Sequence, residues 1–192
     1  MRAGTRERRE SVLTAALGCF TDLGLKTTTI QDIRRAAGCS IGSLYHHFGS
    51  KEGIAEELFI DGMKKFHSGL LDKVSQQKSA RSSVKAVVFF YSEWVTQNQT
   101  LAQYLHSRDI DFSREGLNRI KDLHSEQITQ TFEWFAPFVQ SREMRRLPLE
   151  CYIPIICGPV QEYTRRWLSD PLKQTPLDLQ GVFADAAWRA IS

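Results

Sequence analysis

The sequence lacks long apolar runs. None of its stretches reaches the ~18 consecutive apolar residues expected of a membrane-spanning helix. The first ten residues are rich in charge and contain no apolar core of the kind found in secretory signal peptides. We therefore expect a cytoplasmic protein with no membrane segment.

Cysteine is also scarce. The four cysteines, Cys19, Cys39, Cys151 and Cys157, form neither a C-x-x-C motif nor a dense framework, which favours buried, reduced thiols. Cys151 and Cys157 are six residues apart in a predicted helix and so point to different faces, which disfavours a local redox disulfide. The reactivity of a single thiol stays open.

Several motifs of common enzymes are absent as well. The chain contains no P-loop, no G-x-G-x-x-G and no H-E-x-x-H. His106, Asp109, Asp111 and His124 could gather around a metal ion, but no helical H-x-x-x-H or cysteine-rich spacing supports such a site. We expect no catalytic activity, no metal and no cofactor.

The excess positive charge lies at one end of the chain. The formal net charge is +3, and residues 1–53 carry 8 Lys+Arg against 5 Asp+Glu, whereas residues 54–192 carry 17 of each. A basic N-terminal part would attract DNA phosphates. An excess of three is also within ordinary scatter, so charge alone decides little.

Residues 29–51, TIQDIRRAAGCSIGSLYHHFGSK, predict two short helices joined by a glycine turn. Thr29 and Asp32 have the spacing of a capping box at the start of the first helix. Gly38 can end that helix in a left-handed conformation, and Ser40 can cap the second helix. Two helices, a tight turn with glycine and a polar second helix are typical of the helix-turn-helix motif, whose second helix enters the major groove of DNA.

The rest of the chain has the apolar periodicity of helices. We predict a helix over 5–23, a connecting helix from Lys51, and a loop over 75–83. Further helices are expected from 84, over 101–106, over 114–139 and over 149–168, and a last one opening at T-P-L-D, residues 175–178. The fold class is therefore all-α, with about nine helices.

The run G-C-S-I-G-S-L-Y-H-H-F-G-S-K, preceded by T-I-Q-D-I and by F-x-x-x-G from Phe20 to Gly24, resembles the DNA-binding domain of the TetR family of bacterial transcriptional regulators. The resemblance covers residues 6–55. It implies a helix-turn-helix DNA-binding domain over 1–53 and a helical ligand-binding and dimerisation domain over 54–192. It also implies a homodimeric repressor that a small, mainly hydrophobic or aromatic effector releases from a palindromic double-stranded DNA operator.

The resemblance and the residue types together predict the DNA contacts. The positions that match phosphate contacts of the family are Thr29, Ser40, Tyr45, His46 and Lys51. Arg34, on the exposed face of the first helix, is expected to add another phosphate contact. Thr29 and Ser40 can equally be helix caps and nothing more.

Base contacts must come from the short second helix. Ser43 suits a base edge and Ile41 suits a thymine methyl group, whereas Gly42 lets the backbone approach the groove. His47, next to Phe48, is more typical of domain packing than of DNA contact.

Aromatic and polar residues of the middle helices are candidates for an effector pocket. They are Phe90, Trp94, Tyr104, His106, His124, Trp134, Tyr152 and Trp167. An aromatic stripe at helical spacing is also typical of an ordinary core. A filled core would favour the alternative function, a ligand-independent architectural or division-control DNA-binding protein.

The resemblance places the dimer interface on the last two long helices. The candidates are Pro159, Tyr163, Ala186, Ala187 and Ala190. The same faces can instead pack within one protomer.

Overall fold

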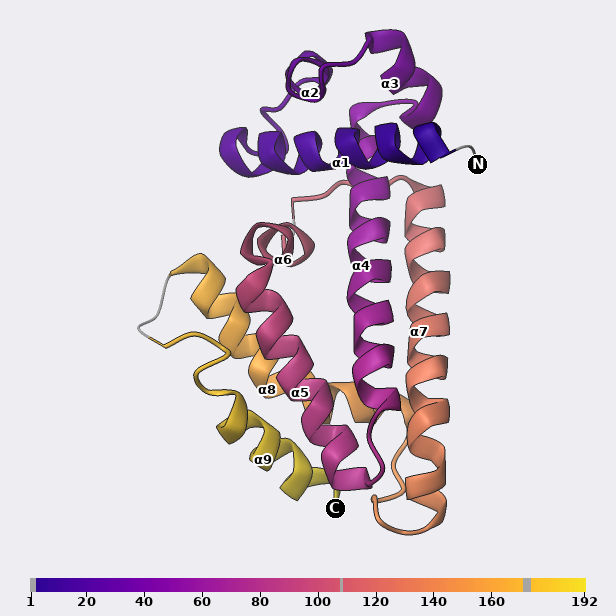
Figure 1. The fold of residues 1–192 in the computed structure, drawn as a ribbon, viewed down its shortest axis with the longest axis vertical. Helices are drawn as coiled ribbons and strands as arrows, with labels where there is room; N and C mark the ends of the chain where they lie inside the picture. Colours follow the sequence, from indigo (N-terminus) through magenta and orange to yellow (C-terminus); the bar gives the residue numbers. More distant parts are fainter. Residues whose placement is uncertain (1–2, 108, 171–173) are drawn as a thin grey trace. The chain divides into compact units, whose positions relative to one another are not determined.

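The structure, a computed structural model, describes residues 3–107, 109–170 and 174–192. Within these ranges the chain forms helices and no strand (Figure 1). The helices are α1 (Ala3–Leu23), α2 (Ile30–Ala37), α3 (Ile41–Phe48), α4 (Lys51–Ser75), α5 (Ala80–Gln97), α6 (Gln99–Leu105), α7 (Arg114–Gln140), α8 (Leu149–Ser169) and α9 (Gln180–Ile191). The all-α prediction is confirmed.

The chain forms two compact units. The first comprises Met1–Lys64 and Thr100–Lys121, and the second comprises Lys65–Gln99 and Asp122–Ser192. The long helices α4 and α7 therefore each contribute residues to both units. These two units are defined by packing alone. The predicted division after residue 53 separates a DNA-binding from a ligand-binding domain by function, and it stays a prediction.

Local capping fixes the start and end of α2 and α3, as the sequence predicts. The Thr29 backbone N–H donates to Asp32 Oδ2 (2.9 Å), and Asp32 N–H donates to Thr29 Oγ1 (3.3 Å), which completes the capping box. Gly38 follows α2 with φ of 62°, a left-handed conformation that favours glycine. Ser40 Oγ accepts the Ser43 N–H (3.2 Å) at the start of α3.

The core of the first unit holds the helix-turn-helix on α1 and on the start of α4. Its buried residues include Val12, Leu13, Ala16, Phe20, Ile33, Leu44, Phe48, Ile54 and Leu58. These are the apolar positions of the helical stripes. Glu57 of α4 bonds both Arg9 of α1 and Arg119 of α7, so an ionic bridge joins three helices within this unit.

The second unit packs α5 against α8 and α9. Val84, Val87, Val88 and Val95 of α5 are fully buried, so this helix is central, as its apolar sequence predicts. The ring of Phe66 on α4 packs against three aromatic rings of α5, those of Phe90, Tyr91 and Trp94.

Two helix starts differ from the prediction by more than two residues. The predicted loop over 75–83 ends earlier, because Ser79 and Ser82 form a capping box and α5 begins at Ala80. The predicted last helix starts later. Thr175 and Asp178 do form their box, but residues 176–179 make a separate turn and α9 begins at Gln180.

Candidate nucleic-acid interface

A tight junction positions the candidate recognition helix α3. Gly49 ends the helix with φ of 73°, and Ser50 Oγ accepts the Gly53 N–H (3.0 Å) to cap α4. A Cβ atom at Gly53 would lie 2.0 Å from the Phe48 carbonyl oxygen, so no side chain fits there. With Leu44 and Phe48 buried in the core, α3 has a fixed orientation on its unit.

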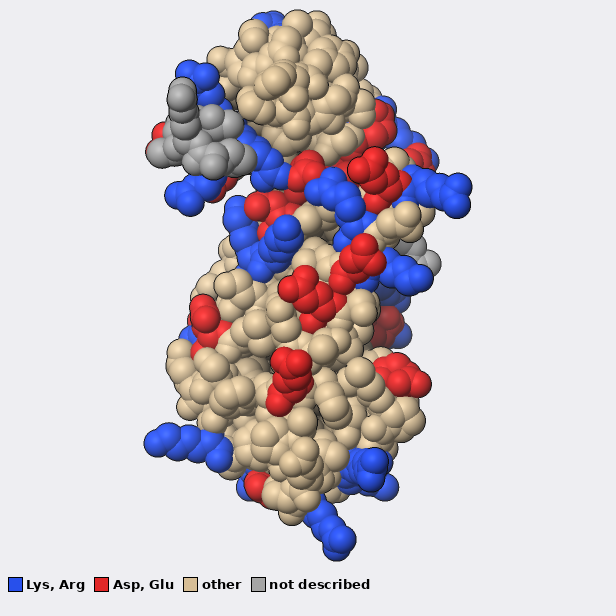
Figure 2. All heavy atoms as spheres, turned by 90° about the vertical axis from the view of Figure 1, so that its right-hand side faces the viewer, with Lys and Arg blue, Asp and Glu red and all other residues tan. Residues whose placement is uncertain are grey.

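The outer face of α3 is exposed and uncharged. Tyr45 is 51% exposed and Ile41 37% exposed, and a Cβ atom at Gly42 would meet no atom within 4 Å. Residues 36–50 contain no Asp, Glu, Lys or Arg. Figure 2 shows a charge-free surface at the top of the view, with side chains of both signs, Lys or Arg and Asp or Glu, along its border. Such a face can meet base edges while flanking cations meet phosphates.

Capping occupies part of the hydrogen-bonding capacity of Thr29 and Ser40. The Thr29 hydroxyl donates to Asp32 Oδ2 (2.6 Å), and this bond lowers the pKa of the Asp32 carboxyl group. Ser40 Oγ accepts the Ser43 N–H and can still donate its own proton to a further acceptor. Ser40 therefore suits a phosphate contact better than Thr29 does.

Both predicted cationic contacts have intramolecular partners. Arg34 Nε donates to Gln31 Oε1 (2.8 Å), which leaves the two terminal nitrogens of its guanidinium for other acceptors. Lys51 Nζ donates to the carbonyl oxygens of Leu25 (3.0 Å) and Lys26 (3.3 Å). His46 is exposed, and its ring lies 4.9 Å from that of His47.

A recess beside α3 adds residues that the sequence prediction missed. It has a volume of about 310 Å³ and lies between α1 and the α2–α3 turn. It is lined by Arg8, Ser11, Val12, Ala37, Gly38, Cys39, Ser40, Ser43 and His47. Arg8 lies one turn before Val12 on α1, so the face that packs on the helix-turn-helix also brings this guanidinium to its edge. The interval of four residues between Arg8 and the apolar Val12 is the feature of the sequence that could have predicted this position of Arg8.

The predicted pocket residues of the first unit have structural roles. Tyr104 stacks on Phe20 (5.9 Å between ring centroids) and donates from its hydroxyl to the Ala55 carbonyl oxygen (2.7 Å). Burial raises the pKa of the Tyr104 hydroxyl. His106 Nδ1 lies 2.8 Å from the Ala102 carbonyl oxygen. Tyr104 is thus part of the core of this unit.

The other predicted pocket residues are dispersed over the second unit. Phe90 and Trp94 contact Phe66, with ring centroids 5.3 and 5.0 Å apart. Trp134 Nε1 lies 3.4 Å from Ser83 Oγ, whereas His124 is exposed on α7. Tyr152 and Trp167 are buried in α8. A pocket built from these side chains stays a prediction.

The candidate dimer residues differ in exposure. Pro159, Ala186 and Ala190 are exposed, and Ala187 is buried within the protomer. The Tyr163 hydroxyl donates to the Gln174 carbonyl oxygen (2.8 Å), and its ring packs on Phe183 (5.4 Å between centroids). Of the five, the three exposed residues can meet a second copy directly.

Two negative findings apply to the part of the chain that the structure describes. It contains no group of three or more His, Cys, Asp or Glu side chains placed to hold a metal ion. Nor is any of its helices both long and apolar enough to cross a membrane.

The helix-turn-helix segment matches a known family. Residues 12–58 match the family described as "Bacterial regulatory proteins, tetR family". This segment carries the DNA-binding domain of the TetR family. Among similar proteins of known name, the HTH-type transcriptional repressor KstR2 of Mycolicibacterium smegmatis is 52% identical over 54 residues, which cover 28% of this chain and 26% of that protein. KstR2 of Rhodococcus jostii is 35% identical over 86 residues, covering 45% and 42%.

These matches span less than half the length of the KstR2 proteins. Solved structures that align over nearly the whole chain show its fold. FadR of Bacillus subtilis, solved in complex with stearoyl-CoA, aligns with a TM-score of 0.83 at 18% identity, covering 95% of this chain and 99% of FadR. A TetR family regulator of Marinobacter aquaeolei aligns with a TM-score of 0.79 at 19% identity, covering 100% and 98%.

Proposed function

We propose that this protein is a DNA-binding transcriptional regulator, most simply a repressor, that binds a palindromic operator. One observation carries the proposal: α3 presents an exposed, uncharged face, and the cationic Arg8 lines the recess beside it. A helix of eight residues offers few base contacts, so most of the affinity must come from phosphates. The names of the KstR2 relatives, which are repressors, support the same function.

The proposed contacts divide by chemistry. Ser43 and Ile41 would meet base edges, and Gly42 would allow close approach of the helix to the groove. The phosphate contacts would come from Thr29, Arg34, Ser40, Tyr45, His46 and Lys51. Arg8 and His47, which line the same recess as Ser40 and Ser43, join this second group.

Regulation by a small effector is the second part of the proposal. The effector is proposed to be mainly hydrophobic or aromatic and to act through α4, which contributes residues to both compact units. A shift of α4 would change the separation of two recognition helices from the ~34 Å between successive major grooves. FadR of the same fold was solved with stearoyl-CoA, a ligand with a long apolar chain.

A homodimer is the third part, because one short recognition helix gives too little affinity and specificity alone. We propose that α8 and α9 meet their counterparts, with Pro159, Ala186 and Ala190 at the contact. Light scattering after size exclusion should give twice the protomer mass. A stable monomer at micromolar concentration, both free and on DNA, would contradict this arrangement.

The experiment that tests the function is a genome-wide map of the sites bound by the purified protein. A few sharp palindromic sites near promoters are expected, and their half-site spacing should fit a two-fold dimer. Diffuse binding at hundreds of sites would instead indicate the architectural alternative, a DNA-binding protein without an effector.

A further inference from the structure

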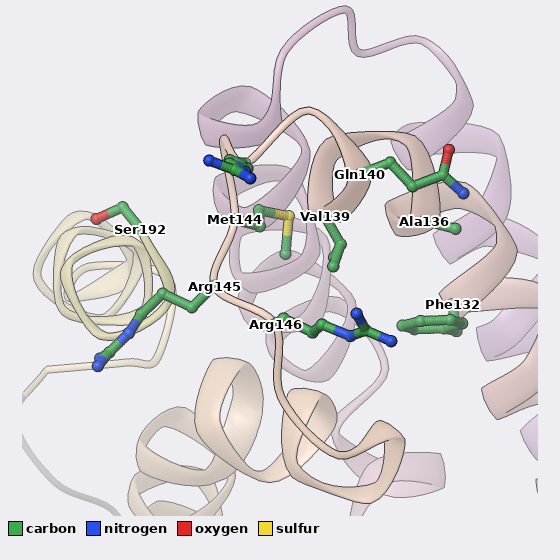
Figure 3. Close-up of a pocket in the computed structure, with 9 residues that line it drawn as sticks. Phe132, Ala136, Val139, Gln140, Met144, Arg145, Arg146 and Ser192 are labelled. Atoms are coloured by element: carbon green, nitrogen blue, oxygen red, sulfur yellow. The ribbon is translucent and has the colours of Figure 1, made fainter.

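A recess of about 690 Å³ lies at the C-terminal end of α7, within the second compact unit (Figure 3). The volume is in the range of small-molecule sites, which is ~300–1,000 Å³. The recess is lined by Phe132, Ala136, Val139, Gln140, Arg142, Met144, Arg145, Arg146 and Ser192. None of these residues belongs to the effector pocket predicted from the sequence.

The walls of the recess are apolar. Phe132, Ala136 and Val139 recur at intervals of three and four residues on one face of α7. Met144 closes the recess from the loop after α7 and is itself buried. This surface suits the hydrocarbon part of a ligand.

Three arginines of the α7–α8 loop, Arg142, Arg145 and Arg146, line the same recess. No Asp or Glu side chain lines it. Arg145 is engaged at the end of α9, because its backbone N–H donates to the Ile191 carbonyl oxygen (2.8 Å) and its Nη1 lies 3.5 Å from that of Ala190. Arg142 and Arg146 are therefore the guanidinium groups best placed to bind an anion.

The backbone at Arg142 supports a role for its side chain. Arg142 has φ of 64° and is the one non-glycine residue with positive φ in the part of the chain that the structure describes. Glycine or asparagine usually takes this left-handed position after a helix, because a side chain with a Cβ atom is disfavoured there. The left-handed backbone at residue 142 ends α7, and glycine would adopt it more easily than arginine. The backbone alone therefore does not explain why an arginine stands there.

The loop that carries the arginines is held in place. The Tyr152 hydroxyl donates to the Arg145 carbonyl oxygen (3.0 Å) and accepts the Leu147 N–H (3.2 Å). The Tyr152 ring packs on Phe132, with centroids 5.4 Å apart. One side chain thus ties the apolar wall to the basic loop, and the site is formed before any ligand arrives.

We propose that this recess binds an amphiphilic anion, a molecule with an apolar body and one carboxylate or phosphate group. The hydrocarbon would lie on Phe132, Val139 and Met144, and the charged group would bind Arg142 and Arg146. A planar guanidinium pairs well with either kind of anion. This site does not depend on the DNA-binding function, because none of its residues belongs to the first unit.

Equilibrium dialysis with four dodecyl probes tests the proposal, with the three charged probes below their critical micelle concentrations and dodecanol below its solubility limit. Dodecanoate and dodecyl phosphate should bind saturably, and the tighter of the two identifies the preferred head group. Dodecanol and dodecyltrimethylammonium should bind at least about tenfold more weakly, since neither carries a negative charge that can pair with a guanidinium. Equal binding of the anions and dodecanol would overturn the proposed role of the arginines.

Matched variants locate the site. Arg142→Gly removes the guanidinium and suits the left-handed backbone, so it should fold at least as stably while binding the anion roughly tenfold more weakly. Arg146→Gln should weaken binding similarly, and Ala136→Trp should block it. Arg114→Gln, at the other end of α7, is the control and should bind as the wild type does. Unchanged binding in Arg142→Gly and Arg146→Gln, with normal circular dichroism, would overturn the site.

Discussion

The ammonium group of Lys51 at the start of α4 donates to the carbonyl oxygen of Leu25, 3.0 Å away, just after α1. A second bond reaches the Lys26 carbonyl oxygen at 3.3 Å. Lys51 therefore ties the α1–α2 loop to α4, and with three donors it retains one for a phosphate. Its predicted role on DNA and its role in the fold involve the same charge.

Replacing Lys51 with alanine should therefore have two effects. Loss of one phosphate contact should lower the slope of log affinity against log salt by about one unit. Loss of the two bonds to the loop should reduce the free energy of unfolding by about 1–2 kcal/mol. Lys26→Ala, which keeps its backbone carbonyl, is the control for stability and should change it by less than about 0.5 kcal/mol. An unchanged salt slope in Lys51→Ala would remove Lys51 from the phosphate contacts.

Ser43 and Tyr45 should respond differently to removal of their hydroxyl groups. Ser43→Ala should alter the preference among operator variants, because a base contact is lost. Tyr45→Phe should weaken binding to all operators by a similar factor, because a phosphate contact carries no sequence information. Competition binding on a set of single-base operator variants distinguishes the two patterns. Uniform weakening by Ser43→Ala would move Ser43 to the phosphate class.

Gly116 should tolerate no side chain while Glu56 keeps its place. A Cβ atom at Gly116 would lie 2.4–2.6 Å from the carboxylate atoms of Glu56, and Glu56 Oε1 accepts the Ser113 N–H (2.5 Å) before α7. Gly116→Ala should therefore destabilise the protein by about 1–3 kcal/mol, as overpacking does.

Gly18 provides the matched control for that substitution. It lies inside α1, and a Cβ atom there would meet nothing within 4 Å, so Gly18→Ala should stabilise the protein by up to ~1 kcal/mol. Both changes can be measured by urea denaturation. The double variant Glu56→Ala/Gly116→Ala should be less destabilised than the sum of its single variants, and strict additivity would argue against the clash.

His67 should make stability depend on pH. It is buried on α4, and Nε2 lies 3.1 Å from the Gln127 carbonyl oxygen and 3.3 Å from Thr131 Oγ1. Burial lowers the pKa of His67, against the opposing effects of the Gln127 carbonyl and Glu126. The unfolded chain, in which the histidine pKa is ~6.5, thus binds more protons below that pH. Stability should be complete above about pH 6.5 and should fall as the pH drops toward the folded-state pKa.

Urea midpoints at about pH 7.5 and about pH 5.5 measure this effect, since the two values lie on either side of the histidine pKa of the unfolded chain. The loss of stability should be smaller in His67→Gln than in the wild type. His124→Gln, at an exposed position of α7, should behave as the wild type does. The same loss in all three proteins would show that other groups cause it.

The sequence predicts the helix-turn-helix well because its signals are local. Thr29, Asp32, Gly38 and Ser40 act through backbone groups no more than four residues away, so spacing alone determines their geometry. Because these signals are local, the predicted start of the last helix at Thr175 was only partly right. Its capping box formed as expected, but a box does not determine whether the following residues continue as a helix.

Contacts between residues that are far apart in the sequence could not be predicted from local spacing. Arg8 reaches the α3 recess, and Glu56 approaches Gly116, only because helices distant in the chain pack together. Tyr104 has the composition of a pocket residue, yet its hydroxyl bonds to Ala55 within a core. An aromatic side chain with one polar atom suits either environment, and only the packing distinguishes them.

The junction at Gly53 has a consequence for the construction of hybrid regulators. Because a single carbon atom there would collide with the Phe48 carbonyl oxygen, the hinge between recognition helix and connector must be transferred intact with any graft. Ile41, Gly42, Ser43, Tyr45 and His46 face outward or lie at the helix edge and can be exchanged as a cassette. If the proposed DNA contacts hold, rewriting these five positions should give new operator specificities while the glycine preserves the angle at which they are presented.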